Sequence, residues 1–136
     1  MRLFIDTNVI VDLLAARTPF LRDAAQLFTL ADTGKVKLFT SSIAVTTTFY
    51  LLQKEVKPEV ARAAIQKLLT IVKVVDAGHS GIIRAINDLQ FKDFEEAVQH
   101  QSALAAKAKI LVTRNEKDFG KSVISVMTPK QVLGLL

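Results

Sequence analysis

Short apolar runs alternate along the chain with longer segments in which apolar residues recur every three or four positions. The longer segments have the periodicity of amphipathic helices, and the short runs have the length of buried strands. Buried strands that alternate with helices are typical of a parallel sheet covered on both faces. We therefore predict an α/β fold with a small central parallel sheet of about four to five strands flanked by helices, the strands being residues 2–5, 36–40, 71–75, 109–112 and 123–126.

Capping residues mark where the helices are expected to begin and end. Asp6, Thr7 and Asn8 follow the first apolar run, and each is a good N-cap. Pro19 is expected to open the second helix and Gly34 to end it. The other helices are expected to begin at Ser41 or Ser42, at Pro58, near residue 80, at Asp93 and after Thr128, where residues 128–131 have the form of a capping box with proline at the first helical position.

The composition is that of an ordinary globular protein. The chain has 136 residues, of which 50% are hydrophobic and 23% are charged, so a single domain spanning residues 1–136 can bury a core. It contains no cysteine, which excludes a disulfide framework and a thiolate metal site. No apolar run approaches the roughly 18 residues needed to span a bilayer, and the N-terminus lacks a signal-peptide pattern. We therefore expect a cytoplasmic protein without a membrane partner.

The positive charge of the chain is concentrated in one segment. The net charge is +5, and residues 35–73 hold seven Lys or Arg against two Glu, which accounts for the whole excess. A basic segment attracts phosphate groups. A solvated helix face has the same composition, so the charge alone does not decide between these two interpretations.

Charged and polar side chains gather where two of the expected strands end. Asp6 follows the first strand directly, and the segment TRNEKDF (residues 113–119) follows the strand at 109–112. In open parallel sheets the chemistry is at the carboxyl ends of the strands, near the point where the strand order reverses. If these two strands are neighbours, Asp6, Asn115 and Asp118 converge on one site.

A third acidic cluster, KDFEEA (residues 92–97), lies at the start of the helix expected to run to about residue 106. Taken alone, Asp93 and Glu96 have the spacing of an N-terminal capping pair. Three acidic clusters from separate parts of the chain also form an oxygen-only ligand set, which suits Mg²⁺ or Mn²⁺. Such an ion held by carboxylates is a usual arrangement for hydrolysing phosphodiesters. The hydroxyls of Thr7 and Thr113 are candidates to hydrogen-bond the carboxylates or a water molecule.

Three motifs together resemble those of the PIN-domain family, in particular the VapC-like toxin ribonucleases. They are LFIDTNVIVDLL near the N-terminus, DFEEAVQ in the second half and ILVTRNEKDF near the end, and they occur in that order over essentially the whole chain. The resemblance implies a Mg²⁺- or Mn²⁺-dependent endoribonuclease with a small parallel sheet between helices. It also implies the toxin half of a toxin–antitoxin pair, with RNA as substrate, a small antitoxin protein as partner and a homodimer as the assembly.

By the same resemblance, roles are expected for individual residues. Asp6 corresponds to the family's first metal-binding acid, Glu96 to the third and Asp118 to the fourth, and all three are candidate catalytic residues. Asp93 is an additional candidate metal ligand, and Asn115, where many members carry Asp, is a further candidate catalytic residue. Supporting hydrogen bonds around these ligands are expected from Thr7, Asn8, Thr47 and Thr113.

One departure from the family pattern bears on activity. The second acid of the family usually lies in the helix after the second strand, in a pattern like S-x-x-T-x-x-E, and here that region reads SSIAVTTTFYLL. We align Thr47 with the missing glutamate, or Thr46 or Thr48 after a one-residue shift. A threonine has no negative charge, so the site has one carboxylate fewer than usual. The departure favours an alternative function, that of a catalytically weak or inactive PIN-like module that binds RNA or a protein.

Other α/β classes lack their own signatures in this chain. A receiver-type phosphoacceptor domain needs a pair of acids after the first strand, and only Asp6 is present there. A haloacid-dehalogenase-type phosphatase needs the pattern D-x-D, and Asn8 occupies the second acidic position. No glycine-rich phosphate loop of the form G-x-x-x-x-G-K-[ST] or G-x-G-x-x-G occurs, which argues against a nucleotide-binding domain.

Overall fold

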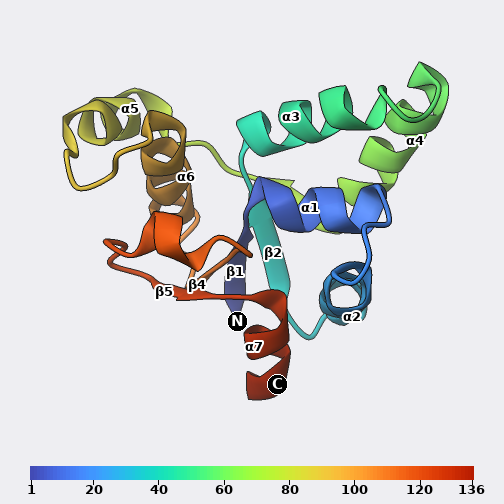
Figure 1. The fold of residues 1–136 in the computed structure, drawn as a ribbon. Helices are drawn as coiled ribbons and strands as arrows, with labels where there is room; N and C mark the ends of the chain where they lie inside the picture. Colours follow the sequence, from blue (N-terminus) through green and yellow to red (C-terminus); the bar gives the residue numbers. More distant parts are fainter.

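The computed structural model describes residues 1–136 and contains one parallel sheet with helices on both faces (Figure 1). The order of the five strands across the sheet is β3-β2-β1-β4-β5, and every neighbouring pair is parallel. This confirms the predicted α/β class and the size of the sheet. The strands are β1 (Arg2–Ile5), β2 (Lys37–Thr40), β3 (Val72–Val74), β4 (Ile110–Val112) and β5 (Ser125–Met127).

The helices cover the two faces of the sheet unequally. Figure 1 shows α5 and α6 on one side and α1 and α2 on the other, with α3 and α4 extending beside α1. None of the helices is both long and apolar enough to cross a lipid bilayer. The helices are α1 (Thr7–Leu14), α2 (Leu21–Asp32), α3 (Ser42–Leu52), α4 (Pro58–Leu68), α5 (Gly78–Asn87), α6 (Phe94–Ala105) and α7 (Pro129–Leu135), and a 3-10 turn, η1 (Glu116–Phe119), follows β4.

Two hydrophobic clusters hold the layers together, one on each face of the sheet. In the central strand β1, Leu3 and Ile5 belong to the cluster shared with α1 and α2, whereas Phe4 belongs to the cluster shared with α6. Successive side chains of a strand point to opposite faces, so Phe4 enters the cluster opposite to that of its two neighbours. All three side chains are fully buried. The uninterrupted apolar run of this strand is therefore explained by burial on both faces.

The strand order places a switch point between β1 and β4. The chain moves from β1 to β2 and β3 on one side, and it returns to β4 and β5 on the other. Beyond the end of β1, the backbone amide of Asp6 donates to the carbonyl of Val112 at 2.9 Å, and the amide of Thr113 donates to Met127 at 3.0 Å. The polar residues that follow β1 and β4 are thus neighbours at the carboxyl edge of the sheet, where ligands bind in open α/β folds.

Most helix starts agree with the capping residues in the sequence. Ser41 caps α3 and Asp93 caps α6, each with its own side chain. Thr128 and Gln131 form the predicted capping box: the Thr128 hydroxyl accepts from the Gln131 amide at 3.2 Å, and the Gln131 side chain accepts from the Thr128 amide at 2.9 Å.

Two boundaries differ from the prediction. The helix expected to open at Pro19 begins at Leu21, because residues 18–20 form a turn in which the amide of Leu21 donates to the carbonyl of Arg17 at 2.8 Å. The last strand begins two residues later than expected. Val123 is 81% exposed and precedes the strand, so its apolar character does not reflect burial in the sheet.

Candidate active site

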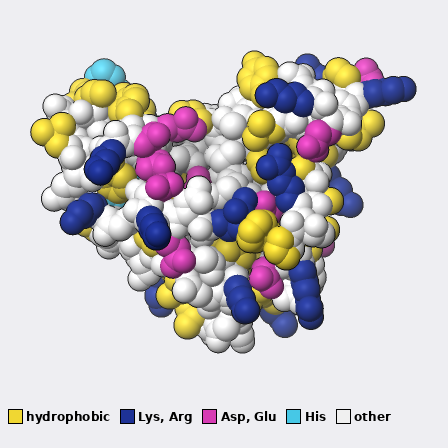
Figure 2. Space-filling model, in the orientation of Figure 1, with side chains coloured by type: hydrophobic (Ala, Val, Ile, Leu, Met, Phe, Trp, Pro, Cys, Tyr) yellow, Lys and Arg dark blue, Asp and Glu magenta, His cyan; other side chains and the backbone are white.

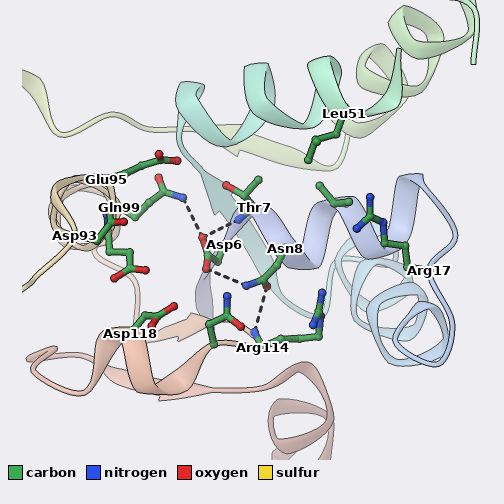
Figure 3. A pocket seen from close by; sticks show the side chains of 13 residues that line it. Asp6, Thr7, Asn8, Arg17, Leu51, Asp93, Glu95, Gln99, Arg114 and Asp118 are labelled. Carbon is green, nitrogen blue, oxygen red and sulfur yellow. Dashed lines mark hydrogen bonds between the residues drawn. The ribbon is translucent and has the colours of Figure 1, made fainter. Parts of the chain in front are cut away.

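A polar cleft of about 330 Å³ opens at the carboxyl edge of the sheet (Figure 3). The segments after β1 and β4 and the start of α6 bring five carboxylates to its lining, and Asn115 joins them. Val11 and Leu51 are the only hydrophobic residues in the lining. The residues expected to converge from separate parts of the chain do lie in this one cleft. The carboxylates are those of the expected ligands Asp6, Asp93, Glu96 and Asp118, together with that of Glu95.

Asp6 is fixed at the centre of the cleft by four hydrogen bonds. Its Oδ1 accepts from the backbone amide of Thr7 at 2.8 Å and from Nε2 of Gln99 at 3.2 Å. Its Oδ2 accepts from the hydroxyl of Thr113 at 2.8 Å and from Nδ2 of Asn8 at 3.3 Å. The expected support from Asn8 and Thr113 is therefore present, whereas Thr7 contributes its backbone amide and not its hydroxyl.

Asn8 and Thr113 also tie the segment after β4 to the start of α1. The buried Thr113 hydroxyl accepts from Nδ2 of Asn8 at 3.1 Å and from the backbone amide of Asn115 at 3.0 Å. Oδ1 of Asn8 accepts from the backbone amide of Arg114 at 3.2 Å. These bonds set the backbone turn that carries Asn115 into the cleft, and the side-chain amide of Asn115 makes no hydrogen bond within the chain.

Gln99 is a part of the site that sequence reasoning missed. It is 2% exposed, and its Oε1 accepts from the hydroxyl of Ser41, which also caps α3 by accepting from the amide of Ala44 at 3.1 Å. Gln99 therefore connects the Asp6 carboxylate with the beginning of α3. One signal in the sequence points to it: Gln99 lies three residues after Glu96 in a helix, and residues at that spacing share one face.

The carboxylates on the α6 side of the cleft affect one another's charge. The pKa of Glu96 is raised to about 7, first by burial, then by a hydrogen bond with Asp118 and by the negative charges of Asp118, Asp93 and Asp6. Asp93 also accepts from the Glu96 backbone amide at 3.2 Å, so the capping role predicted for this pair is present as well. Carboxylates that raise one another's pKa favour either a bound proton or a bound cation.

The donor set fits a hard divalent cation in its chemistry but not in its present spacing. Carboxylate and amide oxygens are the ligands that Mg²⁺ and Mn²⁺ prefer, and the cleft offers them without any nitrogen or sulfur ligand. No three Asp, Glu or His side chains are gathered closely enough here to enclose an ion. Binding would therefore require the side chains of Asp6, Glu96 and Asp118 to move closer together.

The threonines of α3 do not contribute to the cleft. Thr47 makes no side-chain hydrogen bond and does not line the cleft, so the supporting hydrogen bond expected from it is absent. The hydroxyls of Thr46 and Thr48 bond to carbonyls of their own helix, at 3.1 and 2.7 Å. A threonine side chain ends one bond beyond Cβ, whereas the carboxylate oxygens of a glutamate lie two bonds further out. This helix instead presents Leu51 to the cleft.

Two arginines line the end of the cleft opposite to α6 (Figure 3). Arg114 forms a two-point ion pair with Asp12, through Nε to Oδ2 and through Nη2 to Oδ1 at 3.1 Å, and its guanidinium lies 3.9 Å from the ring centre of Phe20. Asp12 is only 1% exposed. Asp12 therefore serves a buried ion pair and does not join the acids at the other end of the cleft. Arg17, the other arginine, makes no side-chain hydrogen bond within the chain.

Comparisons with known proteins agree with this architecture. A family model described as PIN domain matches residues 2–117. Ribonuclease VapC1 of Aquifex aeolicus (strain VF5) is 30% identical over 134 residues, which cover 96% of this chain and 92% of that protein.

Solved structures with the same fold include VapBC-1 from nontypeable Haemophilus influenzae, with a TM-score of 0.70 and 18% identity over 96% of this chain and 99% of that one. A toxin–antitoxin complex from Klebsiella pneumoniae matches with a TM-score of 0.69 and 22% identity, over 93% of this chain and 96% of that one.

Proposed function

The chain belongs to the PIN domain family, and on this basis we propose that it is an endoribonuclease dependent on Mg²⁺ or Mn²⁺ and the toxin component of a toxin–antitoxin pair. One observation carries the proposal: Asp6, Glu96 and Asp118 come from three separate elements and line one cleft at the carboxyl edge of the sheet. The relative named a ribonuclease, 30% identical over nearly the whole chain, supports the same activity.

In this proposal the chain's own residues bind the ion and orient the substrate. Asp6, Glu96 and Asp118 would hold the ion, with Asp93 as an additional ligand. When bound, Mg²⁺ or Mn²⁺ supplies a Lewis acid that activates water and offsets negative charge on the phosphate. The four hydrogen bonds to Asp6 keep its carboxylate in a fixed orientation. Asn115, whose amide is free of internal partners, is placed to hydrogen-bond the attacking water or a phosphate oxygen.

A second candidate function rests on α3. Thr47 supplies no charge at the position of the family's second acid, and Leu51 is the residue that this helix presents to the cleft. Both features suit an inactive module that binds RNA or a protein without cutting it. The two candidates differ in one measurable property, which is whether cleavage depends on Asp6.

The nuclease proposal predicts that Asp6→Asn abolishes cleavage of single-stranded RNA in the presence of Mn²⁺. Loss of a ligand that positions the ion should lower the rate on the order of a thousandfold or more. The measurement is the initial cleavage rate of a panel of labelled RNAs with Mg²⁺ and with Mn²⁺. Asp32→Asn, at the exposed end of α2, is the matched control and should cleave like the wild type.

Binding is expected to behave differently from cleavage. RNA affinity should persist in Asp6→Asn or increase, because a negative charge leaves the cleft, and it should fall steeply with salt concentration. Residual cleavage that is equal in the wild type and Asp6→Asn would identify a contaminant. The enzyme proposal would then be rejected in favour of the inert binder.

We also propose a small antitoxin protein and a second copy of the chain as partners. The structural relatives described as VapBC and toxin–antitoxin complexes support the first. The aromatic segment at residues 49–52, which leaves Tyr50 62% exposed, supports the second. Expression from the native operon should yield a complex with an antitoxin on co-purification and light scattering. Recovery of a lone monomer under gentle conditions would contradict both partners.

A further inference from the structure

The active-site cleft has two ends of opposite charge. Figure 2 shows a group of acidic side chains on the α6 side of the hollow, with Lys and Arg side chains around it, and further basic side chains across the hollow on the α1 side. In Figure 3, Asp93 and Asp118 lie at one end of the cleft and Arg17 and Arg114 at the other, with Asp6 between them. The catalytic proposal uses the acidic end only. The end formed by Arg17 and Arg114, here called the arginine end, has no role in that proposal.

Arg114 is a donor held in one orientation. Asp12 accepts from its Nε and Nη2, and the Phe20 ring lies against the flat face of the guanidinium. Two of the five N–H donors of an arginine are used in this way, and the others remain free. The side chain is still 29% exposed. A guanidinium that is already held in one orientation binds a phosphate with little further loss of side-chain entropy.

Arg17 supplies the uncompensated positive charge of this end. The Arg114–Asp12 pair is neutral as a whole and is the only salt bridge in the structure, so no carboxylate is paired with Arg17. The backbone of Arg17 is fixed: its amide donates to the backbone carbonyl of Asp12 at 3.0 Å, and its carbonyl accepts from the amide of Leu21 at 2.8 Å. Its exposed side chain therefore extends into the cleft lining from a fixed backbone position.

We propose that Arg17 and Arg114 form a subsite for a phosphate group of the RNA backbone that neighbours the phosphate to be cut. This inference rests on the proposed ribonuclease function. The sugar and base between the two phosphates lie along Val11 and Leu51, the two hydrophobic residues of the lining. The subsite also gives a role to α3, the helix that lacks the second acid, since its Leu51 offers an apolar contact that accepts any base.

The charge pattern favours a nucleic-acid strand over an acidic peptide. Once a divalent cation is held at the acidic end, both ends of the cleft attract anions. A ligand that satisfies both must carry negative charges at regular intervals along a flexible chain, which describes single-stranded RNA. An acidic side chain of a protein partner would satisfy the arginine end alone. The two ligands are separated by the experiment below.

The first arm measures binding without cleavage. In the Asp6→Asn background, fluorescence anisotropy follows a labelled single-stranded RNA over a series of salt concentrations. Arg17→Gln should weaken binding several-fold and reduce the salt slope of log K by about 0.7, the value for one phosphate contact on a single strand. Lys109→Gln removes the same charge at the opposite edge of the sheet, just before β4, and should leave the slope unchanged.

The second arm locates the phosphate. Cleavage by the otherwise wild-type chain is measured on RNAs that carry one neutral methylphosphonate linkage at successive positions around the cut. One flanking position should lower kcat/KM roughly tenfold, and Arg17→Gln should remove that sensitivity while leaving the other positions unchanged. Arg114→Lys, which keeps the charge but loses the two-point fork, should reduce the sensitivity in part.

Each outcome has a distinct meaning. If Arg17→Gln keeps the salt slope and the methylphosphonate profile of its parent, the subsite is rejected while the nuclease function stands. If the wild type does not cleave but the salt slope still falls in Arg17→Gln, the nuclease function fails and the subsite beside a cut is rejected with it, while Arg17 is identified as a phosphate contact of an RNA-binding module. If Arg17→Gln leaves RNA binding unchanged and weakens the complex with the antitoxin, the arginine end serves the protein partner and the RNA subsite is wrong.

Discussion

Asp6 receives hydrogen bonds from four residues, and none of these donors carries a positive charge. They orient the carboxylate without an ion pair, so its negative charge remains for a cation in the cleft. Gln99 is the donor least expected from local sequence, since glutamine is mostly exposed in proteins. Its bond to Ser41 makes the position of Asp6 depend on the start of α3, the helix that lacks the family's second acid.

A single added carboxylate on α3 tests whether the missing second acid weakens metal binding. We predict that Thr47→Glu tightens Mn²⁺ binding on the order of tenfold, because one more charged oxygen ligand joins an incomplete set. Isothermal titration calorimetry on the purified chain measures the change. Thr46→Glu, on the exposed side of the same helix, is the matched control and should bind Mn²⁺ like the wild type. A gain in Thr46→Glu but not in Thr47→Glu would show that the alignment is shifted by one residue.

The secondary-structure elements were largely predictable, because the signals that define them are local. The apolar run of β1 and the capping box at Thr128 each depend on a few consecutive residues. The meeting of Asp6 and Asp118 was predicted on the condition that their strands are neighbours, since the carboxyl ends of adjacent parallel strands share one edge, and the strand order meets that condition. Where an element boundary was wrong, as at Pro19, a turn replaced the first turn of a helix.

The arginine end and Gln99 were not predictable in the same way. Asp12 and Arg114 are 102 positions apart, and Gln99 and Asp6 are 93 apart, so their contacts depend on how α1 and α6 face the sheet. One local pattern was available. The helix at residues 94–105 has polar residues at four consecutive positions, 99–102, so at least one of them must face the core and needs a hydrogen-bond partner there; in the structure all four are buried.

At the scale of the whole molecule, two titratable groups link folding to pH in opposite directions. Glu96 has a pKa raised to about 7, so its contribution to stability grows as the pH falls from 7 towards its unfolded value of 4.5. His100 is 4% exposed, and burial lowers its pKa against a smaller opposing effect of the Asp88 charge. Its Nε2 accepts from the amide of Val123 at 3.3 Å, so the neutral ring carries its proton on Nδ1, which has no partner.

His100 should therefore make the folded chain sensitive to acid. The unfolded state takes up a proton near pH 6.5 while the folded state resists it, so this contribution to stability is present above pH 6.5 and is lost below it. We predict that, between about pH 7.5 and about pH 5.5, the free energy of unfolding of the wild type falls relative to that of His100→Gln. The pH is varied in steps of about half a unit. Urea unfolding in EDTA measures both curves, and EDTA removes any coupling of Glu96 to metal.

The control is His79→Gln, at an exposed histidine of α5. Its free energy of unfolding should change with pH in parallel with that of the wild type. Because the comparison uses the change with pH, a uniform loss of stability in His100→Gln does not affect it, and parallel curves for His100→Gln and the wild type would show that His100 is not the linked group.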